Sequence, residues 1–159
     1  EARRSSTDRR VSVVADLVNK TPGPWVVWCD LNAESGALTA AIDGALEIRG
    51  SDDIEDKEQA LRAFATGEAR VLVSKPSICG WGLNWQHCHQ MAFVGLSDSF
   101  EGYYQAVRRC WRFGQRKPVD VHVVSSELEG AVVANIKRKG AMAEEMAKEL
   151  TEATREALQ

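Results

Sequence analysis

The 159-residue sequence lacks the features of a secreted or membrane protein. It has no apolar run of about 18 residues, the length that a transmembrane helix needs. Its first ten residues, EARRSSTDRR, contain no apolar stretch of the kind found in signal peptides. The sequence also has no C-x-x-C pair, and this favours reduced thiols over a disulfide or zinc framework for its four cysteines, Cys29, Cys79, Cys88 and Cys110. We therefore expect a soluble cytoplasmic protein with no membrane segment.

A phosphate-binding loop of the form G-x-x-x-x-G-K-[ST] is also missing. Asp30 ends the apolar run Trp25–Cys29 in the manner of a Walker B aspartate, but without that loop the chain is not a complete ATPase. His87-Cys88-His89 has no further ligand pair nearby, so we expect no metal site. The net charge of −3 excludes a globally basic nucleic-acid binder, and any basic surface must be local.

Short apolar runs alternate with helical patterns along the chain, which is typical of βαβ units around a mostly parallel sheet. With 44% hydrophobic residues, the chain can form one domain over residues 1–159. The pattern predicts strands at 25–29, 45–48, 70–73, 90–94 and 119–124, and helices around 11–18, 33–42, 55–66 and 100–115. A C-terminal helical extension over 127–159, bent near Gly140, is predicted from an apolar stripe formed by Leu128, Val132, Ile136, Met142, Met146 and Leu150.

The segment 100–115, FEGYYQAVRRCWRFGQ, carries a concentration of positive charge. At about 100° per residue, a helix would place Gln105, Arg108, Arg109 and Arg112 on one polar face. Five of the ten residues from 108 to 117 are basic. Arginine suits polyphosphate because its guanidinium is always charged and presents a planar fork to phosphate oxygens. The alternative is a solvated cationic helix face without a ligand.

The segment 74–86, SKPSICGWGLNWQ, follows a predicted strand at its carboxyl end, where open α/β sheets bind ligands. Gly80 and Gly82 would let the backbone approach a ligand, and Asn84 offers an amide donor and acceptor. Trp81 could stack on a base. The alternative is a loop whose glycines serve turn geometry alone.

In their order along the chain, these segments resemble the motifs of one protein family. Residues 105–115 resemble motif VI of Snf2-like proteins, Q-x-x-x-R-x-x-R-x-G-Q, and residues 80–84, GWGLN, resemble motif V. Residues 26–30 are similar to the motif IV strand, and Arg49-Gly50-Ser51 with Phe64 to the segment between motifs IV and V. Over about residues 22–150, the chain resembles the second RecA-like domain of superfamily 2 helicases and translocases, most closely the Snf2-like branch.

The resemblance implies a three-layer RecA-like α/β domain, with a mostly parallel central sheet, helices on both faces and a long C-terminal helix. It also implies that ATP and Mg²⁺ are bound mainly by an N-terminal RecA-like domain. Arg112 and Arg109 would act on that ATP as arginine fingers, with Gln105, Gly80, Gly82 and Asn84 lining or coupling to the ATP cleft. The segment Lys75-Pro76-Ser77 departs from the family's S-T-[RK]-A-G-G. Nucleic acid would then be contacted by Ser74, Lys75, Ser77 and Trp81.

The implied function is the C-terminal half of an ATP-dependent DNA helicase or Snf2-like DNA translocase, inactive as an ATP hydrolase without its N-terminal ATPase domain. Two alternatives stay open. One is an RNA-directed superfamily 2 helicase, although motif VI begins here with Gln105 in place of that group's H-R-x-G-R-x-x-R pattern. The other is a non-catalytic interaction module on the same scaffold.

Overall fold

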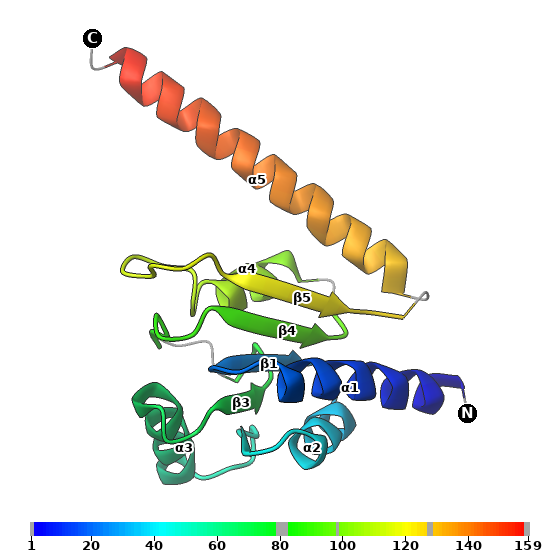
Figure 1. Ribbon diagram of the computed structural model, residues 1–159. Coiled ribbons are helices and arrows are strands. Elements are labelled where there is room, and N and C mark those ends of the chain that lie inside the picture. The colour runs from blue at the N-terminus through cyan, green and yellow to red at the C-terminus, as the bar shows by residue number, and fades with distance from the viewer. Residues whose placement is uncertain (1, 79–82, 98, 127–128, 158–159) are drawn as a thin grey trace.

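The centre of the molecule is a five-stranded sheet in the order β2-β3-β1-β4-β5 (Figure 1). The computed structural model describes residues 2–78, 83–97, 99–126 and 129–157. All four strand pairings are parallel. The strands are β1 Trp25–Cys29, β2 Ala45–Glu47, β3 Val71–Ser74, β4 Gln90–Val94 and β5 Asp120–Val124. Each lies within one residue of its predicted bounds, and the predicted parallel α/β sheet is confirmed.

Helices cover both faces of this sheet, as predicted, and give three layers. One face packs against α1 (Ala2–Lys20) and α2 (Asn32–Ala41), and the other against α3 (Ile54–Thr66) and α4 (Phe100–Val107). Along β1, Val27 belongs to the first core, whereas Val26 and Trp28 belong to the second. Because β1 is buried on both faces, its sequence is a continuous apolar run and not an alternating one.

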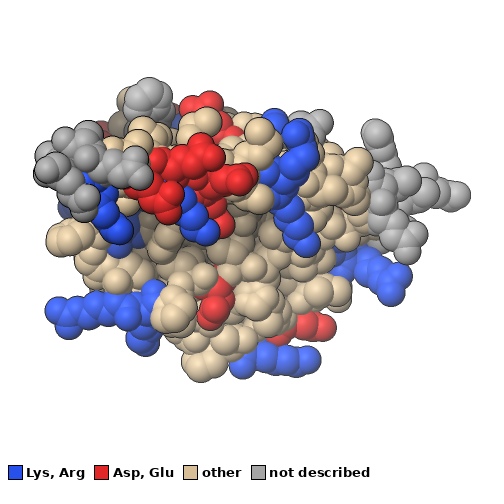
Figure 2. Space-filling model, turned by 90° about the horizontal axis from the view of Figure 1, so that it is seen from above, with Lys and Arg blue, Asp and Glu red and all other residues tan. Residues whose placement is uncertain are grey.

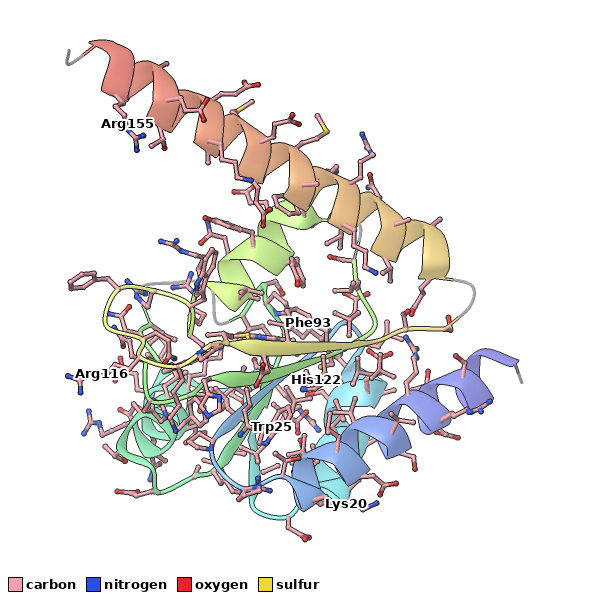
Figure 3. The ribbon with its side chains drawn as sticks, turned by 45° about the horizontal axis from the view of Figure 1, so that its top comes forward. Lys20, Trp25, Phe93, Arg116, His122 and Arg155 are labelled. Carbon is pink, nitrogen blue, oxygen red and sulfur yellow. The ribbon has the colours of Figure 1, made fainter. Side chains whose placement is uncertain are left out.

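The long connection between β3 and β4 contributes to the second core. Trp85 from this connection is 1% exposed. Its ring lies 5.3 Å from the Phe64 ring in an edge-on arrangement and 6.1 Å from the Trp28 ring. On the same face, Phe93 packs against Tyr103 of α4, with ring centroids 5.0 Å apart, and Figure 3 shows it beneath that helix. The connection is therefore held firmly at its C-terminal end.

Helix α4 is shorter than the sequence predicted, because it ends at Val107 and not near Gln115. Beyond it, two backbone carbonyls have hydrogen-bond partners other than the amides of a continuing helix. The Arg109 carbonyl accepts a hydrogen bond from the Trp85 amide at 2.8 Å, and the Cys110 carbonyl accepts one from the Gln115 side chain at 3.2 Å. The prediction of a helical face over residues 108–115 was wrong.

Helix α5 (Gly130–Ala157) runs without a break through Gly140, so the predicted bend is absent (Figure 1). Its first half touches the body: Ile136 is buried. Met142 and Met146 are 56% and 64% exposed, so the apolar stripe faces solvent beyond Gly140. Leu128 lies outside the described residues. None of the described helices combines the length and apolarity needed to cross a membrane.

Candidate functional site

A cleft of about 800 Å³ opens at the carboxyl edge of the sheet. We call it the carboxyl-edge cleft. Its walls come from the ends of β1, β3 and β4 and from the start of α4, and its lining includes Asp30, Lys75, Ser77, Gly95 and Gln105. Carboxyl ends of parallel strands are where open α/β sheets bind ligands. The predicted location beyond the β3 end therefore coincides with a real cavity.

The structure separates the predicted nucleic-acid residues from one another. Lys75 is half-buried, Ser77 is exposed, and both line the cleft. Ser74 is fully buried, and its hydroxyl donates to the Ile48 carbonyl at 3.0 Å. Trp81, Gly80 and Gly82 lie outside the described residues. Of the predicted nucleic-acid residues that the structure describes, Lys75 and Ser77 line the cleft and Ser74 does not.

The start of α4 forms one wall of this cleft. Ser99 caps the helix: its hydroxyl accepts a hydrogen bond from the Gly102 amide at 3.0 Å. The positive end of a helix favours anions, although Glu101 places a negative charge in the same first turn. Gln105, one turn further on, is exposed and lines the cleft.

The second candidate region is the arginine turn, which we define as residues 108–115. Arg112 and Arg109 each donate a hydrogen bond from Nη1 to the Leu83 carbonyl, at 3.2 and 3.4 Å. Asn84, the next residue after Leu83, is exposed. The structure therefore brings together Arg109, Arg112 and Asn84, which the sequence analysis assigned to one ATP cleft.

The two guanidinium groups differ in exposure. Arg109 is only 7% exposed, whereas Arg112 is half-buried. Arg108 takes a third position, with its guanidinium carbon 5.7 Å from the Tyr104 ring and 5.8 Å from the Trp111 ring. Arg116 stands out into solvent at the side of the molecule (Figure 3). A uniformly solvated cationic face, the alternative interpretation, does not fit a buried Arg109.

The arginine turn is held by the connection that precedes β4. Besides the Trp85 amide, Gln86 donates from Nε2 to the Phe113 carbonyl at 3.2 Å. Gln115 donates from Nε2 to both the Cys88 carbonyl at 2.9 Å and the Cys110 carbonyl. The sequence analysis included Gln115 in its motif VI pattern but gave it no role. Its role in the structure is to tie the turn to the segment before β4.

The cleft and the turn lie at opposite ends of α4, which begins beside the cleft and ends at the turn. Gln105 is one of the described residues that line the cleft, whereas Arg109 and Arg112 are not among them. Gln105 therefore lines the cleft, and its predicted coupling to the two arginines stays a prediction.

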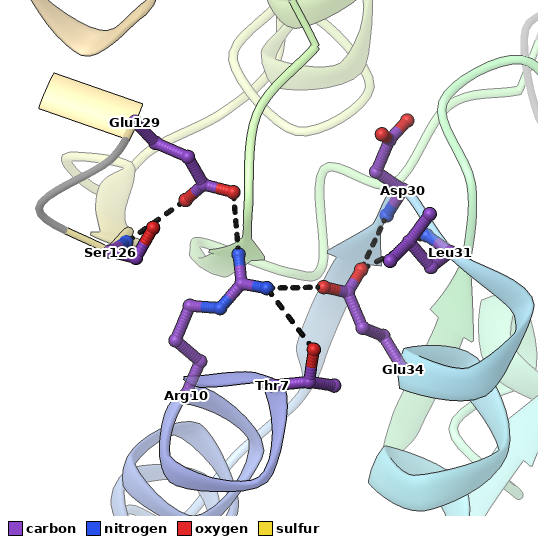
Figure 4. Close-up of polar contacts among 7 residues, drawn as sticks. All are labelled: Thr7, Arg10, Asp30, Leu31, Glu34, Ser126 and Glu129. Atoms are coloured by element: carbon purple, nitrogen blue, oxygen red, sulfur yellow. Dashed lines mark hydrogen bonds and ion pairs between the residues drawn. The ribbon is translucent and has the colours of Figure 1, made fainter. Parts of the chain in front are cut away.

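An ionic network, shown in Figure 4, adjoins the cleft residue Asp30. The Arg10 guanidinium of α1 pairs with Glu34 of α2 at 2.9 Å and with Glu129, just before α5, at 2.8 Å. Sequence reasoning missed all three residues. One local signal was available, because Glu34 is the third residue of its helix, the position from which a glutamate reaches back to the helix cap.

The face seen in Figure 2 carries no single sign of charge over a wide area, so charge effects there come from individual side chains. Figure 2 shows acidic and basic side chains next to one another on the face seen from above. Burial raises the pKa of the Cys29 thiol to about 11, so this cleft residue stays protonated at neutral pH. Across the part of the chain that the structure describes, no group of three or more His, Cys, Asp and Glu residues could hold a metal ion.

Residues 10–114 match the family model described as "Helicase conserved C-terminal domain". The chain belongs to this family of superfamily 2 helicase domains. It is 26% identical over 113 residues to "DEAD-box ATP-dependent RNA helicase 35A" of Oryza sativa subsp. japonica, covering 68% of this chain and 18% of that protein. It is 27% identical over 109 residues to "ATP-dependent RNA helicase eIF4A" of Yarrowia lipolytica, covering 66% of this chain and 27% of that protein. The domain therefore spans about a fifth to a quarter of these curated relatives.

Two solved structures share the fold. The C-terminal domain of the DEAD-box protein Dbp5 aligns with a TM-score of 0.67 at 16% identity, covering 82% of this chain and 77% of that one. The C-terminal part of the Fun30 ATPase domain aligns with a TM-score of 0.70 at 14% identity, covering 80% and 44%. These similarities confirm the RecA-like fold. They do not confirm the predicted Snf2-like branch, and the sequence relatives are named as RNA helicases.

Proposed function

We propose that this domain is the C-terminal RecA-like half of an ATP-dependent RNA helicase. In a longer protein it would face ATP bound by an N-terminal RecA-like domain and hold nucleic acid in the carboxyl-edge cleft. The observation that carries the proposal is the arginine turn: Arg112, half-buried, is anchored through one nitrogen to the Leu83 carbonyl beside the exposed Asn84. The membership of residues 10–114 in the helicase C-terminal family supports this assignment.

Arg112 would supply charge to the phosphoryl transfer. A guanidinium has five N–H donors, and the bond from Nη1 to Leu83 leaves others to face the transferred phosphate. Such a cation stabilises the charge that develops on the phosphate oxygens in the transition state. Mg²⁺ would be held with ATP by the N-terminal domain. Buried Arg109 would fix the Leu83 carbonyl, and so the position of Arg112.

Lys75 and Ser77 would contact the nucleic-acid backbone in the cleft. Lysine is a mobile point charge that pairs with phosphate, and a serine hydroxyl can donate a hydrogen bond to it. With a net charge of −3 and few phosphate contacts, the domain alone should bind nucleic acid weakly and lose it as salt rises. The two sequence relatives are named as RNA helicases, and this favours RNA as the substrate.

A DNA translocase is the second candidate. Gln105 favours it, because motif VI of the Snf2-like branch begins with glutamine at this position. The experiment that separates the two is the ATPase activity of the longer protein with single-stranded RNA, single-stranded DNA and duplex DNA of equal length. The proposal expects the strongest stimulation by RNA. Stimulation by duplex DNA alone would replace the RNA assignment by the DNA translocase, and no stimulation by any of them would contradict a nucleic-acid-dependent ATPase.

The 159-residue chain alone provides a further test. It should fold but hydrolyse no ATP, because it has no phosphate-binding loop. A coupled ATPase assay with Mg²⁺ and RNA would measure this. Steady turnover that survives rigorous purification would contradict the assignment to one half of an interdomain site.

A further inference from the structure

We propose that Arg10 is a positioning residue for the carboxyl-edge cleft, which it shapes through Glu34 and through the backbone at the end of β4. The inference rests on the proposed role of the cleft in nucleic-acid binding. Among the described residues that line the cleft, Arg10 does not appear, so it would act through neighbours such as Glu34, which Figure 4 shows between Arg10 and Asp30.

The contact between Arg10 and Glu34 is deeply buried. The Arg10 side chain is 10% exposed and that of Glu34 only 1%. Their 2.9 Å ion pair joins α1 to α2, which are also in contact through the first core. Loss of either partner would leave a charge in a region with little water, and so the arrangement strongly favours both residues in their present positions.

Glu34 transmits this constraint to the cleft. Its Oε1 accepts from Arg10, while its Oε2 accepts hydrogen bonds from the backbone amides of Asp30 at 3.1 Å and Leu31 at 3.0 Å. These amides belong to the turn that ends β1, and Asp30 lines the cleft. Only a carboxylate can accept on both sides in this way. The amide of glutamine has one acceptor oxygen and would turn its NH₂ group either toward Arg10 or toward the turn.

Gly95 gives a second route from Arg10 to the cleft. It follows β4, lines the cleft and has a φ of +74°. A Cβ atom at this position would lie 2.9 Å from Arg10 Nη1, so the guanidinium rests directly against the backbone here. Arg10 thus supports the ends of both β1 and β4, between which the cleft opens.

The other ion pair of Arg10, to Glu129, leaves the contacts of Glu34 with the Asp30–Leu31 turn in place and provides a control for that route. Because Glu129 Oε1 would lie 3.6 Å from a Cβ atom at Gly95, it does not control for the route through Gly95. Glu129 accepts from Arg10 through Oε1 and from the Ser126 amide through Oε2 at 3.0 Å. Neither Glu129 nor Ser126 is among the described residues that line the cleft. Glu129→Gln therefore changes the same type of contact on the α5 side, while Glu34→Gln changes it on the cleft side.

The test measures binding of a fluorescein-labelled 20-nucleotide single-stranded RNA to the 159-residue chain and its variants at low salt. Glu34→Gln should raise the Kd by about tenfold, because the Asp30–Leu31 turn loses its anchor. Glu129→Gln should leave the Kd within about twofold of that of wild type. It should lower the melting temperature about as much as Glu34→Gln does. Equal effects of the two variants on Kd would overturn the proposal and reduce the network to a stabilising role.

A measurement without ligand separates this inference from the proposed function. Amide hydrogen exchange at Asp30 and Leu31 should accelerate at least tenfold in Glu34→Gln and stay near the wild-type rate in Glu129→Gln. Unchanged exchange at both amides in Glu34→Gln would also overturn the proposal. If Glu34→Gln does not fold, Arg10→Lys takes its place, since a lysine ammonium does not reproduce the guanidinium's contacts from Nη2 to Glu34 and from Nη1 to Glu129.

Lys75→Ala completes the set, because it removes a cleft cation without touching the network. If Lys75→Ala leaves RNA affinity unchanged, the cleft is not the RNA site and the proposed function fails at that point. The exchange rates of Asp30 and Leu31 would still decide whether Arg10 positions the turn. If Lys75→Ala weakens binding but Glu34→Gln does not, the cleft binds RNA and the positioning role of Arg10 is wrong.

Discussion

The arginine turn and the carboxyl-edge cleft are held in place by different means. Backbone carbonyls of the turn accept hydrogen bonds from the segment before β4, and its two key arginines share one further carbonyl. The cleft is an open space whose lining residues Lys75 and Ser77 are at least partly accessible. Beside it, a buried ion pair fixes the turn that ends β1.

This difference fits the two tasks we propose. Catalysis on a phosphoryl group requires a cation held to within a fraction of an ångström, and backbone hydrogen bonds give such precision. In the proposed function, a nucleic-acid backbone moves through its site during each cycle. Accessible side chains such as Lys75, in a cleft whose backbone is held in place, are therefore adequate. The substitutions below therefore have different expected effects on turnover, folding and binding.

The largest effect is expected for Arg112→Ala in the longer protein that carries both RecA-like domains. The kcat for RNA-stimulated ATP hydrolysis should fall about 10³-fold or more, the usual contribution of an arginine finger. ATP affinity should change much less if, as we propose, an N-terminal RecA-like domain makes most of the nucleotide contacts. Single-turnover hydrolysis measured together with nucleotide binding tests this.

Two controls accompany Arg112→Ala. Arg112→Lys should restore little activity, because a point charge does not reproduce the guanidinium fork. Arg116→Ala, which removes an exposed cation nearby, should keep near-normal turnover. A wild-type rate in Arg112→Ala would end the arginine-finger assignment.

Arg109→Ala should instead act mainly on folding. Its side chain is buried and bonds to the Leu83 carbonyl, so its removal should lower the free energy of unfolding of the 159-residue chain by about 2–4 kcal/mol. Urea denaturation measures the loss, with Arg116→Ala as the exposed counterpart. If Arg109→Ala had the same free energy of unfolding as wild type, the buried Arg109 side chain would not stabilise the arginine turn.

Lys75→Ala should affect nucleic-acid binding and neither folding nor the arginine turn. The Kd for single-stranded RNA at low salt should rise by about three- to tenfold, and the slope of log Kd against log salt should decrease by about 0.7, as expected for one lost phosphate contact. Lys20→Ala, an exposed cation at the end of α1, serves as the control (Figure 3). The same loss of affinity in both variants would show that RNA responds to the overall charge of the domain and not to Lys75 in the cleft.

The smallest effect is expected for Phe113→Ser. The Phe113 side chain is 99% exposed, while its backbone carbonyl is bonded to Gln86. If the backbone holds the turn, this substitution should change the free energy of unfolding by no more than about 0.5 kcal/mol. A loss of several kcal/mol, measured by urea denaturation, would mean that side-chain packing and not backbone bonding fixes the turn.

The fold was largely predictable because its three central strands, β3, β1 and β4, are buried on both faces. Such strands give short continuous apolar runs, as in Trp25–Cys29 and Gln90–Val94, and these runs marked the strand positions within one residue. The pairing of Arg109 and Arg112 with the segment around Asn84 was also anticipated, from the resemblance to motifs V and VI. Both predictions rest on signals that lie within a few consecutive residues.

The features that the sequence did not predict depend on distant partners. Helix α4 stops at Val107, and the Arg109 carbonyl beyond it accepts a hydrogen bond from Trp85 of the connection before β4, whereas the amphipathic periodicity continues past that point. Arg10 and Glu129 are 119 residues apart, so no local pattern could pair them. On α5, the apolar stripe continues through the exposed Met142 and Met146, and periodicity alone does not show whether a partner surface reaches that far.

The most direct test is a titration of the ATPase activity of the longer protein with single-stranded RNA, carried out in parallel for Arg112→Ala and Lys75→Ala. We expect Arg112→Ala to abolish most of the maximal rate, and Lys75→Ala to raise the RNA concentration at half-maximal rate while the maximal rate persists. If Lys75→Ala lowered the maximal rate as strongly as Arg112→Ala at the same half-saturating RNA concentration, the division of catalysis and RNA binding between the arginine turn and the carboxyl-edge cleft would be contradicted.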